Sequence, residues 1–284
     1  MSKNYTLTIG SDPEMLIRQK STGRIVSAIP LVKATKLEPI DLGDGYKFYC
    51  DNVAVESSIP PADSKEKFLE IIQTMINKMN SRLPEGYEVI PMASHVFDDD
   101  QLQDEGAKEI GCSPFWLSHT WEDAEPPQLP GNLRAVGFHI HIGRDDFEKC
   151  ELTDFLIDGY SKVDVINNMD LFVGIPSIIF DNSKQAQERK TIYNQAAGSH
   201  RPTAYGVEYR PLSSDVARSP ELLALIYDLT VMAVKHAENK ELFKNIDEDS
   251  VIDCINNHKI DLARELMAQY MSPELIARIE SFAN

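Results

Sequence analysis

Short segments in which polar and apolar residues alternate constrain the fold of this chain more than any other feature. The clearest is GFHIHIG, from Gly137 to Gly143. In an extended backbone successive side chains point to opposite faces, so His139 and His141 share one face and the apolar residues around them share the other. Two neighbouring imidazoles admit three interpretations: metal ligands, groups that handle phosphate or protons, or a polar sheet surface.

Strand-type and helix-type patterns follow one another in a definite order. Alternation predicts strands within 4–18, 23–30, 44–61, 87–97, 134–143 and 205–212. Apolar residues at helical spacing predict helices over 63–79, 150–174 and 214–240, and short capped helices after residue 240. This order favours an α+β fold with a mainly antiparallel sheet over a doubly wound fold. We expect one large domain over 1–240, with a helical extension over 241–284 packed on it.

Two helix starts and one loop carry local signals. Asp63 and Glu66 have the spacing of a capping box, and Ser219 with Pro220 marks the start of the later long helix. The acidic, aperiodic stretch 98–131 predicts a long loop, and such loops in compact domains are usually functional or mobile. Its acidic part is expected to attract a cationic amine or to close over a reaction intermediate.

Composition excludes several classes of protein. With 42% hydrophobic and 26% charged residues, the 284-residue chain has the composition of a globular protein. The longest apolar run, over 171–180, is far shorter than a membrane span and contains Gly174 and Pro176. The polar start shows no export signal, and the four cysteines form no CxxC pair, which favours reduced thiols and a cytoplasmic location. A net charge of −17 disfavours general nucleic-acid binding and suits a site that concentrates cations.

Acidic residues share strand faces with other functional side chains in three further segments. Asp12 and Glu14 lie together in SDPE, and Glu208 lies beside Arg210 in VEYR. In DNVAVE, a regular strand puts Asp51 on the face opposite Glu56. Any one of these carboxylates alone is most simply a solvated residue.

Taken together, these residues favour a cation site. Several carboxylates on one sheet face repel one another and lose hydration, so their convergence requires cations. Oxygen ligands with a single imidazole suit Mg²⁺ or Mn²⁺. The guanidinium of Arg210 would clamp a phosphate or carboxylate. Basic residues upstream suggest an anionic ligand such as a nucleotide triphosphate, although ordinary surface ion pairs explain them as well; they are Arg189, Lys190, His200 and Arg201.

The ordered motifs GSDPEM, DNVAVESSIPP, GFHIHIG and AYGVEYRPLSS resemble the phage-type COOH–NH2 ligases. These are small amidoligases with a catalytic domain like that of glutamine synthetase and glutamate–cysteine ligase. The resemblance runs from about Ile9 to Ser214. It implies a glutamine synthetase-like domain whose antiparallel sheet curves into a half-barrel backed by helices. The concave face would hold ATP and two or three Mg²⁺ or Mn²⁺ ions.

The resemblance also implies roles for individual residues. Asp12 and Glu14 would serve different metal ions. Glu56 would join Glu14 on one ion, and His139 with Glu208 would join Asp12 on the other. His141 would lie nearer the phosphates. Three arginines would stabilise the transferred phosphoryl group or hold the carboxylate substrate: Arg210, Arg201 and Arg189.

The chemistry that this family performs would activate a small-molecule or peptide carboxylate with the γ-phosphoryl group of ATP. An amine then displaces phosphate from the acyl phosphate and forms an amide or isopeptide bond. Asp51 or a carboxylate of the long loop would accept the proton of the amine. No membrane partner is expected, a homo-oligomer remains open, and a phage-encoded protein would work in the cytoplasm of the infected host.

Two other functions fit the same residues. A metal-dependent hydrolase or oxygenase could use His139, His141 and a carboxylate, although such sites usually lie on the first strand of a barrel. A phage-associated binding protein without catalytic activity is the second alternative. Both would lack ATP-dependent ligation.

Overall fold

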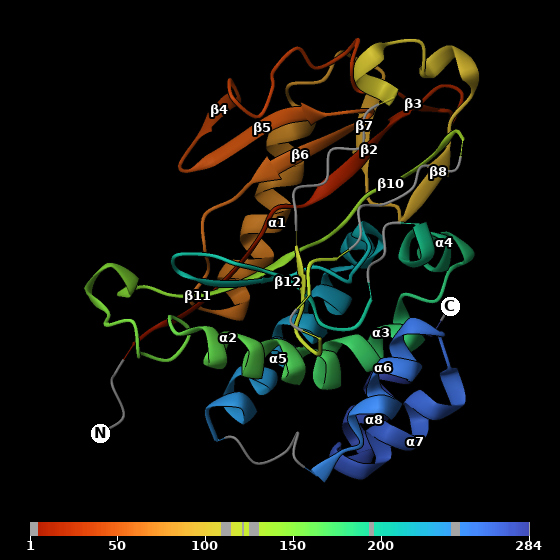
Figure 1. Cartoon of the computed structure of the whole chain (residues 1–284). Coiled ribbons are helices and arrows are strands. Elements are labelled where there is room, and N and C mark those ends of the chain that lie inside the picture. The colour runs from red at the N-terminus through yellow and green to blue at the C-terminus, as the bar shows by residue number, and fades with distance from the viewer. Residues whose placement is uncertain are drawn as a thin grey trace.

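The computed structural model describes residues 5–108, 115–120, 122–124, 131–192, 196–239 and 245–283. Its strands form an upper layer in Figure 1, and most of its helices lie beneath them. All paired strands are antiparallel. The α+β class predicted from the sequence is therefore confirmed.

Two larger sheets and one small sheet make up the strand layer. The first sheet has the order β1 (Leu7–Ser11), β11 (Ile140–Arg144), β13 (Gly206–Tyr209), β12 (Ser199–Pro202) and β9 (Trp116–Leu117). The second has the order β3 (Ile25–Val26), β2 (Glu14–Gln19), β6 (Ala54–Ser58), β5 (Tyr46–Asp51) and β4 (Ile40–Gly43), and β7 (Tyr87–Ile90) pairs with β2. The small sheet pairs β8 (Ser94–Val96) with β10 (Leu133–Ala135).

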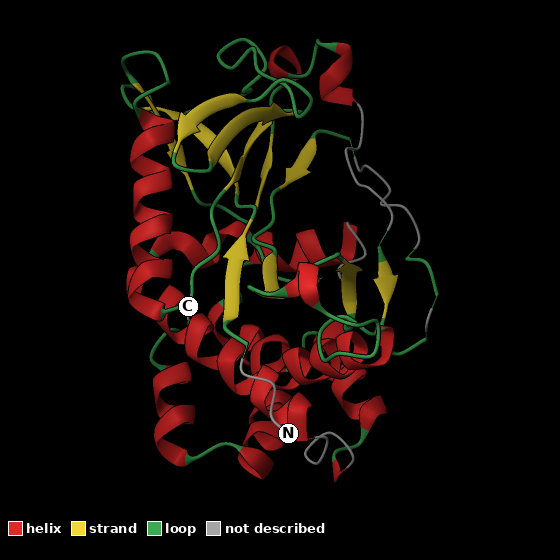
Figure 2. Ribbon diagram, turned by 90° about the vertical axis from the view of Figure 1, so that its left-hand side faces the viewer, coloured by secondary structure: helices red, strands yellow, loops and turns green. Residues whose placement is uncertain are grey.

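One continuous segment joins the two larger sheets. The chain leaves β1 at Ser11, passes Asp12 and Pro13, and enters β2 at Glu14. Proline has no backbone N–H, so a ladder is easily interrupted at this point. The carbonyl of Pro13 accepts from the N–H of Ser57 at 3.2 Å, which ties the break to the second sheet. The antiparallel strands thus follow one curled half-barrel surface (Figure 2).

The segment 44–61 is a hairpin and not the single strand that the alternation predicts. Asp51 pairs with Ala54 across a two-residue turn, and Asn52 has a φ of 56°. Asparagine tolerates this left-handed conformation better than most residues. The reversal brings Asp51 to the same face as Glu56, which corrects the expectation that it points away.

Helix α1 (Lys65–Asn80) packs on the second sheet with its predicted apolar face. The buried residues are Phe68, Ile71, Ile72, Met75 and Met79. The N-cap is Ser64, whose hydroxyl accepts from the N–H of Lys67, so the expected capping box at Asp63 is wrong by one residue. Helix α5 (Pro220–Asn239) begins at the predicted proline, and the Ser219 hydroxyl accepts from the N–H of Leu222.

The central helix starts later and continues further than its sequence pattern predicts. It combines α2 (Gly159–Met169), a π-helical turn (Asp170–Gly174) and α3 (Ile175–Phe180), running through Gly174 and Pro176. In the π-helical register Pro176 would donate to the carbonyl of Leu171, but proline has no N–H. The hydroxyl of Tyr270 donates to that carbonyl instead, at 2.5 Å.

This central helix is also long and apolar enough to cross a membrane. However, 89% of the apolar window within Gly159–Phe180 is buried inside the protein. Helix α2 packs on α5 and touches β12 and β13, so the helix forms part of the core beneath the first sheet. Its apolar surface is therefore explained by packing.

The C-terminal helices close the lower end of the fold (Figure 1). They are α6 (Glu248–Asn256), α7 (Ile260–Tyr270) and α8 (Pro273–Glu280). The remaining helix, α4 (Lys184–Ile192), lies earlier in the chain, before β12. Helix α8 has the predicted cap, since Ser272 accepts from the N–H of Leu275. Ile255 and Ile279 belong to the same buried cluster as Ile9 and Phe138 of the sheet region. The expected division at residue 240 stays a prediction.

Candidate functional site

The predicted polar residues come together where β1, β2, β5, β6, β11 and β13 meet. The alternation in GFHIHIG is confirmed, because Phe138, Ile140 and Ile142 are fully buried in the core. His139 and His141 point to the opposite side, toward Asp12. Five carboxylates lie in this region: Asp12, Glu14, Asp51, Glu56 and Glu208.

The first group of candidate ligands consists of Asp12, His141 and Glu208. One ligand atom from each lies within 4.8 Å of the others. Nε2 of His141 is 3.3 Å from Oδ1 of Asp12. His139 is close by as well, with Nδ1 at 3.0 Å from Asp12 Oδ1 and 3.4 Å from Glu208 Oε1. Both imidazoles therefore face the same carboxylate pair, and the ligand role of His139 stays a prediction.

The second group consists of Glu14, Asp51 and Glu56, again within 4.8 Å. Glu14 stands opposite Glu56 in the β2–β6 register. Its Oε2 accepts from the N–H of Gly137 at 2.6 Å, which fixes the carboxylate at the start of the GFHIHIG segment. The hairpin turn brings Asp51 into this group, although the sequence alternation predicted that it lies on the strand face opposite Glu56.

Burial and mutual repulsion act strongly on this second group. Burial raises the pKa of Glu14 to about 8, and the charges of Asp51 and Glu56 add to the rise. Burial and the charge of Asp12 raise the pKa of Glu56 to about 7. Burial also raises the pKa of Asp51, against the opposing charge of Lys36. Three carboxylates this close oppose one another's ionisation unless cations neutralise them.

The first group behaves in the opposite way. Burial alone would raise the pKa of Asp12, but the charges of His139 and His141, together with the hydrogen bond to His139, outweigh it and lower the pKa well below its usual range. Burial and Arg210 lower the pKa of His139. Burial would also lower the pKa of His141, but Asp12 and then Glu208 raise it. Asp12 is thus ionised at neutral pH.

Two arginines hold Glu208. Nη1 of Arg210 makes a very short contact with Oε1 of Glu208. Nη1 of Arg201 lies 3.3 Å from Oε1 and 3.1 Å from Oε2. The guanidinium of Arg210 also stacks over the ring of Phe115, with 5.3 Å between the guanidinium carbon and the ring centroid. A carboxylate that is only 2% exposed thus has two cationic partners beside the first ligand group.

The remaining basic residues are divided between the site and the helical layer. Arg189 is 3% exposed and donates to the carbonyls of Pro211 and Arg210. A Cβ on Gly137 would lie 2.6 Å from Arg189 Nη2 and 2.8 Å from His139 Nε2, so glycine is needed there. Lys190 lies 3.4 Å from the Ser177 hydroxyl of α3. Nδ1 of His200 bonds to the Gly198 carbonyl. The expectation that all four upstream basic residues reach the carboxylates is wrong for these last two.

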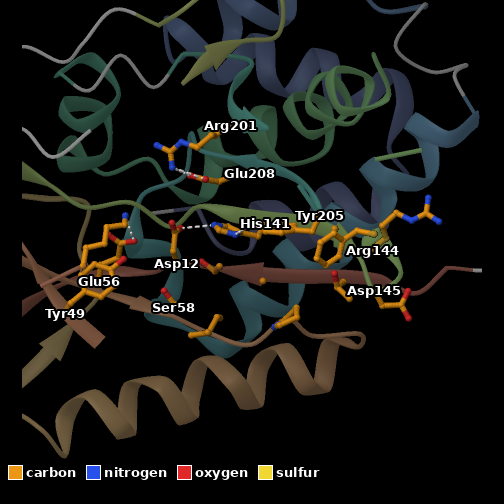
Figure 3. Close-up of a pocket in the computed structure, with 18 residues that line it drawn as sticks. Asp12, Tyr49, Glu56, Ser58, His141, Arg144, Asp145, Arg201, Tyr205 and Glu208 are labelled. Carbon is orange, nitrogen blue, oxygen red and sulfur yellow. Dashed lines mark hydrogen bonds and ion pairs between the residues drawn. The ribbon is translucent and has the colours of Figure 1, made fainter. Parts of the chain in front are cut away.

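A cavity of about 660 Å³ opens beside the carboxylates. Figure 3 shows Asp12 in the middle of it, with Glu56 on one side, His141 and Tyr205 on the other, and Glu208 with Arg201 across from it. Lining residues that the sequence did not single out include Lys36, Tyr49 and Tyr205. Lys36 lies 3.5 Å from Glu56, and Tyr49 hydrogen-bonds the same carboxylate. The hairpin register identifies Tyr49 as a neighbour of this carboxylate, because Tyr49 stands directly opposite Glu56.

Only part of the acidic loop is described. Within 98–108 the chain forms two short 3₁₀ turns, Asp99–Gln101 and Glu105–Lys108. Asp98 and Asp100 both pair with Arg24, at 2.8 and 2.7 Å. Residues 109–114, 121 and 125–130 lie outside the described residues, together with Cys112. The other three cysteines are free thiols, as the sequence predicts.

The donor set fits divalent metal ions. Both ligand groups are dominated by carboxylate oxygens, which Mg²⁺ and Mn²⁺ prefer. Nε2 of His141 is buried and makes no hydrogen bond of good geometry with any described residue. A buried nitrogen without such a partner, directed at Asp12 and Glu208, is a suitable metal ligand. A polar cavity with arginines nearby also suits a phosphate-bearing ligand.

Comparison with known proteins gives little beyond the fold. No protein-family model matches the sequence. No curated protein matches it either. A solved structure described as a novel glutamine synthase homolog aligns with a TM-score of 0.43 and 11% identity. The alignment covers 97% of this chain and 65% of that one, so this chain spans about two thirds of its length. The chain is thus similar in backbone to a glutamine synthase homolog, and the similarity assigns no activity.

Proposed function

We propose that this protein is an ATP- and Mg²⁺-dependent carboxylate–amine ligase of the phage-type amidoligase kind. It would join a small-molecule or peptide carboxylate to an amine and release ADP and phosphate. The observation that carries the proposal is the pair of three-ligand groups side by side, with two arginines on the shared wall. The ordered sequence motifs that resemble those ligases supply all of these residues except Arg201.

The two ligand groups support two divalent ions, which would be Mg²⁺ or Mn²⁺. The family resemblance also allows a third ion, but the described residues contain no third group of candidate ligands for it. When bound, Mg–ATP supplies the phosphoryl group that turns a carboxylate into a reactive acyl phosphate. The proposed ligands of one ion are Asp12, Glu208 and a histidine, and those of the other are Glu14, Asp51 and Glu56.

The arginines would neutralise negative charge during the phosphoryl transfer. Preorganised cations that meet developing charge are the largest contribution that a protein makes to such reactions. Arg201 lines the cavity and is the best placed to contact a phosphate or the substrate carboxylate. Arg210 is buried and contacts the carboxylate of Glu208. From there it would also neutralise negative charge on the transferred phosphoryl group. Arg189 donates to backbone carbonyls of Arg210 and Pro211 and would support the segment that follows β13.

Deprotonation of the amine requires a base. Asp51 was the first candidate, but its position within the second ligand group favours a role as a metal ligand. Burial raises its pKa, which makes it a stronger base than an ordinary aspartate. The assignment of Asp51 as the base therefore depends on whether it stays outside the coordination shell. We propose a cytoplasmic protein whose partners are its small-molecule or peptide substrates.

The test is an assay of ADP and phosphate release with ATP, Mg²⁺ and pools of amino acids or polyamines. We expect ADP formation that depends on substrate and falls by at least about 100-fold in Glu14→Ala and His139→Ala, as for loss of a metal or transition-state contact. Glu85→Ala, which changes an exposed residue of the α1–β7 turn, serves as the control and should keep full activity.

Two other outcomes would replace the proposal. Hydrolysis of a substrate without ATP would favour a metal-dependent hydrolase that uses the same histidines and carboxylates. No ADP formation with any pool, together with intact metal binding, would favour a binding protein without catalytic activity.

A further inference from the structure

Tyr205 makes a hydrogen bond that the sequence did not reveal. Its hydroxyl lies 2.5 Å from Nδ1 of His141, the outer histidine of GFHIHIG. The two rings are stacked, with their centroids 6.0 Å apart and their planes at 17°. Both residues line the cavity (Figure 3). A phenol that touches one nitrogen of an imidazole affects what the other nitrogen can do.

The position of Tyr205 is set by several independent contacts. It sits in the β12–β13 turn, where Thr203 and Gly206 exchange backbone hydrogen bonds. A Cβ on Gly143 would lie 2.9 Å from Cδ2 and 3.0 Å from the carbonyl oxygen of Tyr205, so glycine at that position makes room for the tyrosine. Phe147 packs edge-on against the Tyr205 ring, with a centroid distance of 6.3 Å. Gly143, the final glycine of GFHIHIG, thus leaves space for the Tyr205 side chain.

The two ring nitrogens of His141 have different surroundings. Nδ1 has a close partner in the Tyr205 oxygen, whereas Nε2 lies 3.3 Å from Oδ1 of Asp12 in a poorly directed contact. A neutral imidazole carries one N–H, and a cation can bind Nε2 only when that proton is on Nδ1. With a cation among the carboxylates, Nδ1 would therefore donate to the Tyr205 oxygen, and the Nε2 lone pair would face the ion beside Asp12 and Glu208.

We infer that Tyr205 is a positioning residue that orients His141 and fixes its tautomer, so that Nε2 can bind a divalent cation together with Asp12 and Glu208. The inference rests on the proposed metal site. Partners behind a ligand imidazole typically change metal affinity by 10- to 100-fold when they are removed. Tyr205→Phe keeps the ring and its packing on Phe147 and removes only the oxygen.

Two measurements test this role. The first is Mn²⁺ affinity by calorimetry, in which Tyr205→Phe should bind about tenfold or more weakly than the wild type. The second is ¹⁵N NMR of the His141 ring during titration with diamagnetic Mg²⁺, in which the wild type should convert to the Nδ1–H tautomer and Tyr205→Phe should keep a larger Nε2–H fraction at the same Mg²⁺ concentration. Tyr5→Phe is the matched control, because it removes a phenol oxygen that donates to Glu238 and should change neither result.

A double-mutant cycle separates positioning from a general loss of structure. In a His141→Ala background, Tyr205→Phe should have no further effect on Mn²⁺ affinity. A persisting loss there, or a wild-type tautomer in Tyr205→Phe, would overturn the inference. Wild-type protein that binds no Mn²⁺ would overturn the metal site itself, together with the metal-binding part of the inference. Unchanged tautomers with full ligase activity would overturn the inference and leave the proposed function intact.

Discussion

At the scale of single residues, Glu208 has competing partners. Its carboxylate contacts Arg210 and Arg201, and the same group belongs to the ligand set with Asp12 and His141. A divalent ion that binds Glu208 must share these oxygens with guanidinium groups or displace them. Displaced guanidiniums can then meet the anionic ligand. Metal and anion binding are therefore expected to assist each other at this carboxylate.

Arg201→Gln is predicted to tighten Mn²⁺ binding in the absence of anions by about fivefold. A part-exposed ion pair is worth up to about 1 kcal/mol, and removing it frees Glu208 for the ion. Calorimetry with and without sulfate, at constant ionic strength, measures the effect. Sulfate should tighten Mn²⁺ binding in the wild type and have little effect in Arg201→Gln. Weaker Mn²⁺ binding in the variant would contradict this account, and Arg18→Gln at the exposed Glu88 pair is the control.

At the level of elements, side-chain alternation within strands predicts the facing of residues correctly, whereas turns are the source of error. His139, His141 and Glu208 face the cavity region because each lies within or beside a regular strand. Asp51 was assigned to the wrong face, since the Asn52 turn reverses the chain and period-two counting fails across it. Tyr205 and Lys36 lie in loops, where the spacing of residues contains no information on which strand they will approach.

The central helix offers a test at this scale. Tyr270→Phe removes the donor that replaces the missing N–H of Pro176, leaving the buried carbonyl of Leu171 without it. We predict a loss of about 1–3 kcal/mol in the free energy of unfolding, the cost of an unsatisfied buried acceptor. Urea denaturation measures it. Tyr160→Phe, at a side chain that is 76% exposed, should stay within about 0.5 kcal/mol of the wild type. Equal stability of the two variants would show that the π-helical turn does not depend on Tyr270.

At the scale of the whole molecule, one buried histidine links the sheet, the core helix and the C-terminal helices. Nε2 of His119, just after β9, lies 2.8 Å from Asp170 of the π-helical turn, and Nδ1 lies 2.6 Å from Glu248 of α6. Asp170 also accepts from the hydroxyl of Tyr209, in the strand that carries Glu208. The C-terminal helices are therefore connected to the site strand by a continuous hydrogen-bonded path.

This link predicts a dependence of stability on pH. Burial alone would lower the pKa of His119, but Asp170 and then Glu248 outweigh it and raise the pKa to about 8. A raised histidine pKa stabilises the fold fully below its unfolded value of about 6.5, and the contribution disappears as the pH rises through about 8. The raised pKa of His119 contributes about 2 kcal/mol to the free energy of unfolding. The difference in unfolding free energy between wild type and His119→Gln should shrink by this amount between pH 6 and pH 9. A constant difference would contradict the assignment.

Two divalent ions are proposed to bind side by side next to the arginine-lined cavity. Anomalous diffraction from crystals of the full chain grown with Mn²⁺ tests this directly. We expect two Mn²⁺ peaks, one among Asp12, Glu208 and a histidine, and one among Glu14, Asp51 and Glu56. Glu208→Gln should weaken or remove the first peak and leave the second. Mn²⁺ peaks that avoid these carboxylates, or none at a concentration that saturates carboxylate sites, would contradict it.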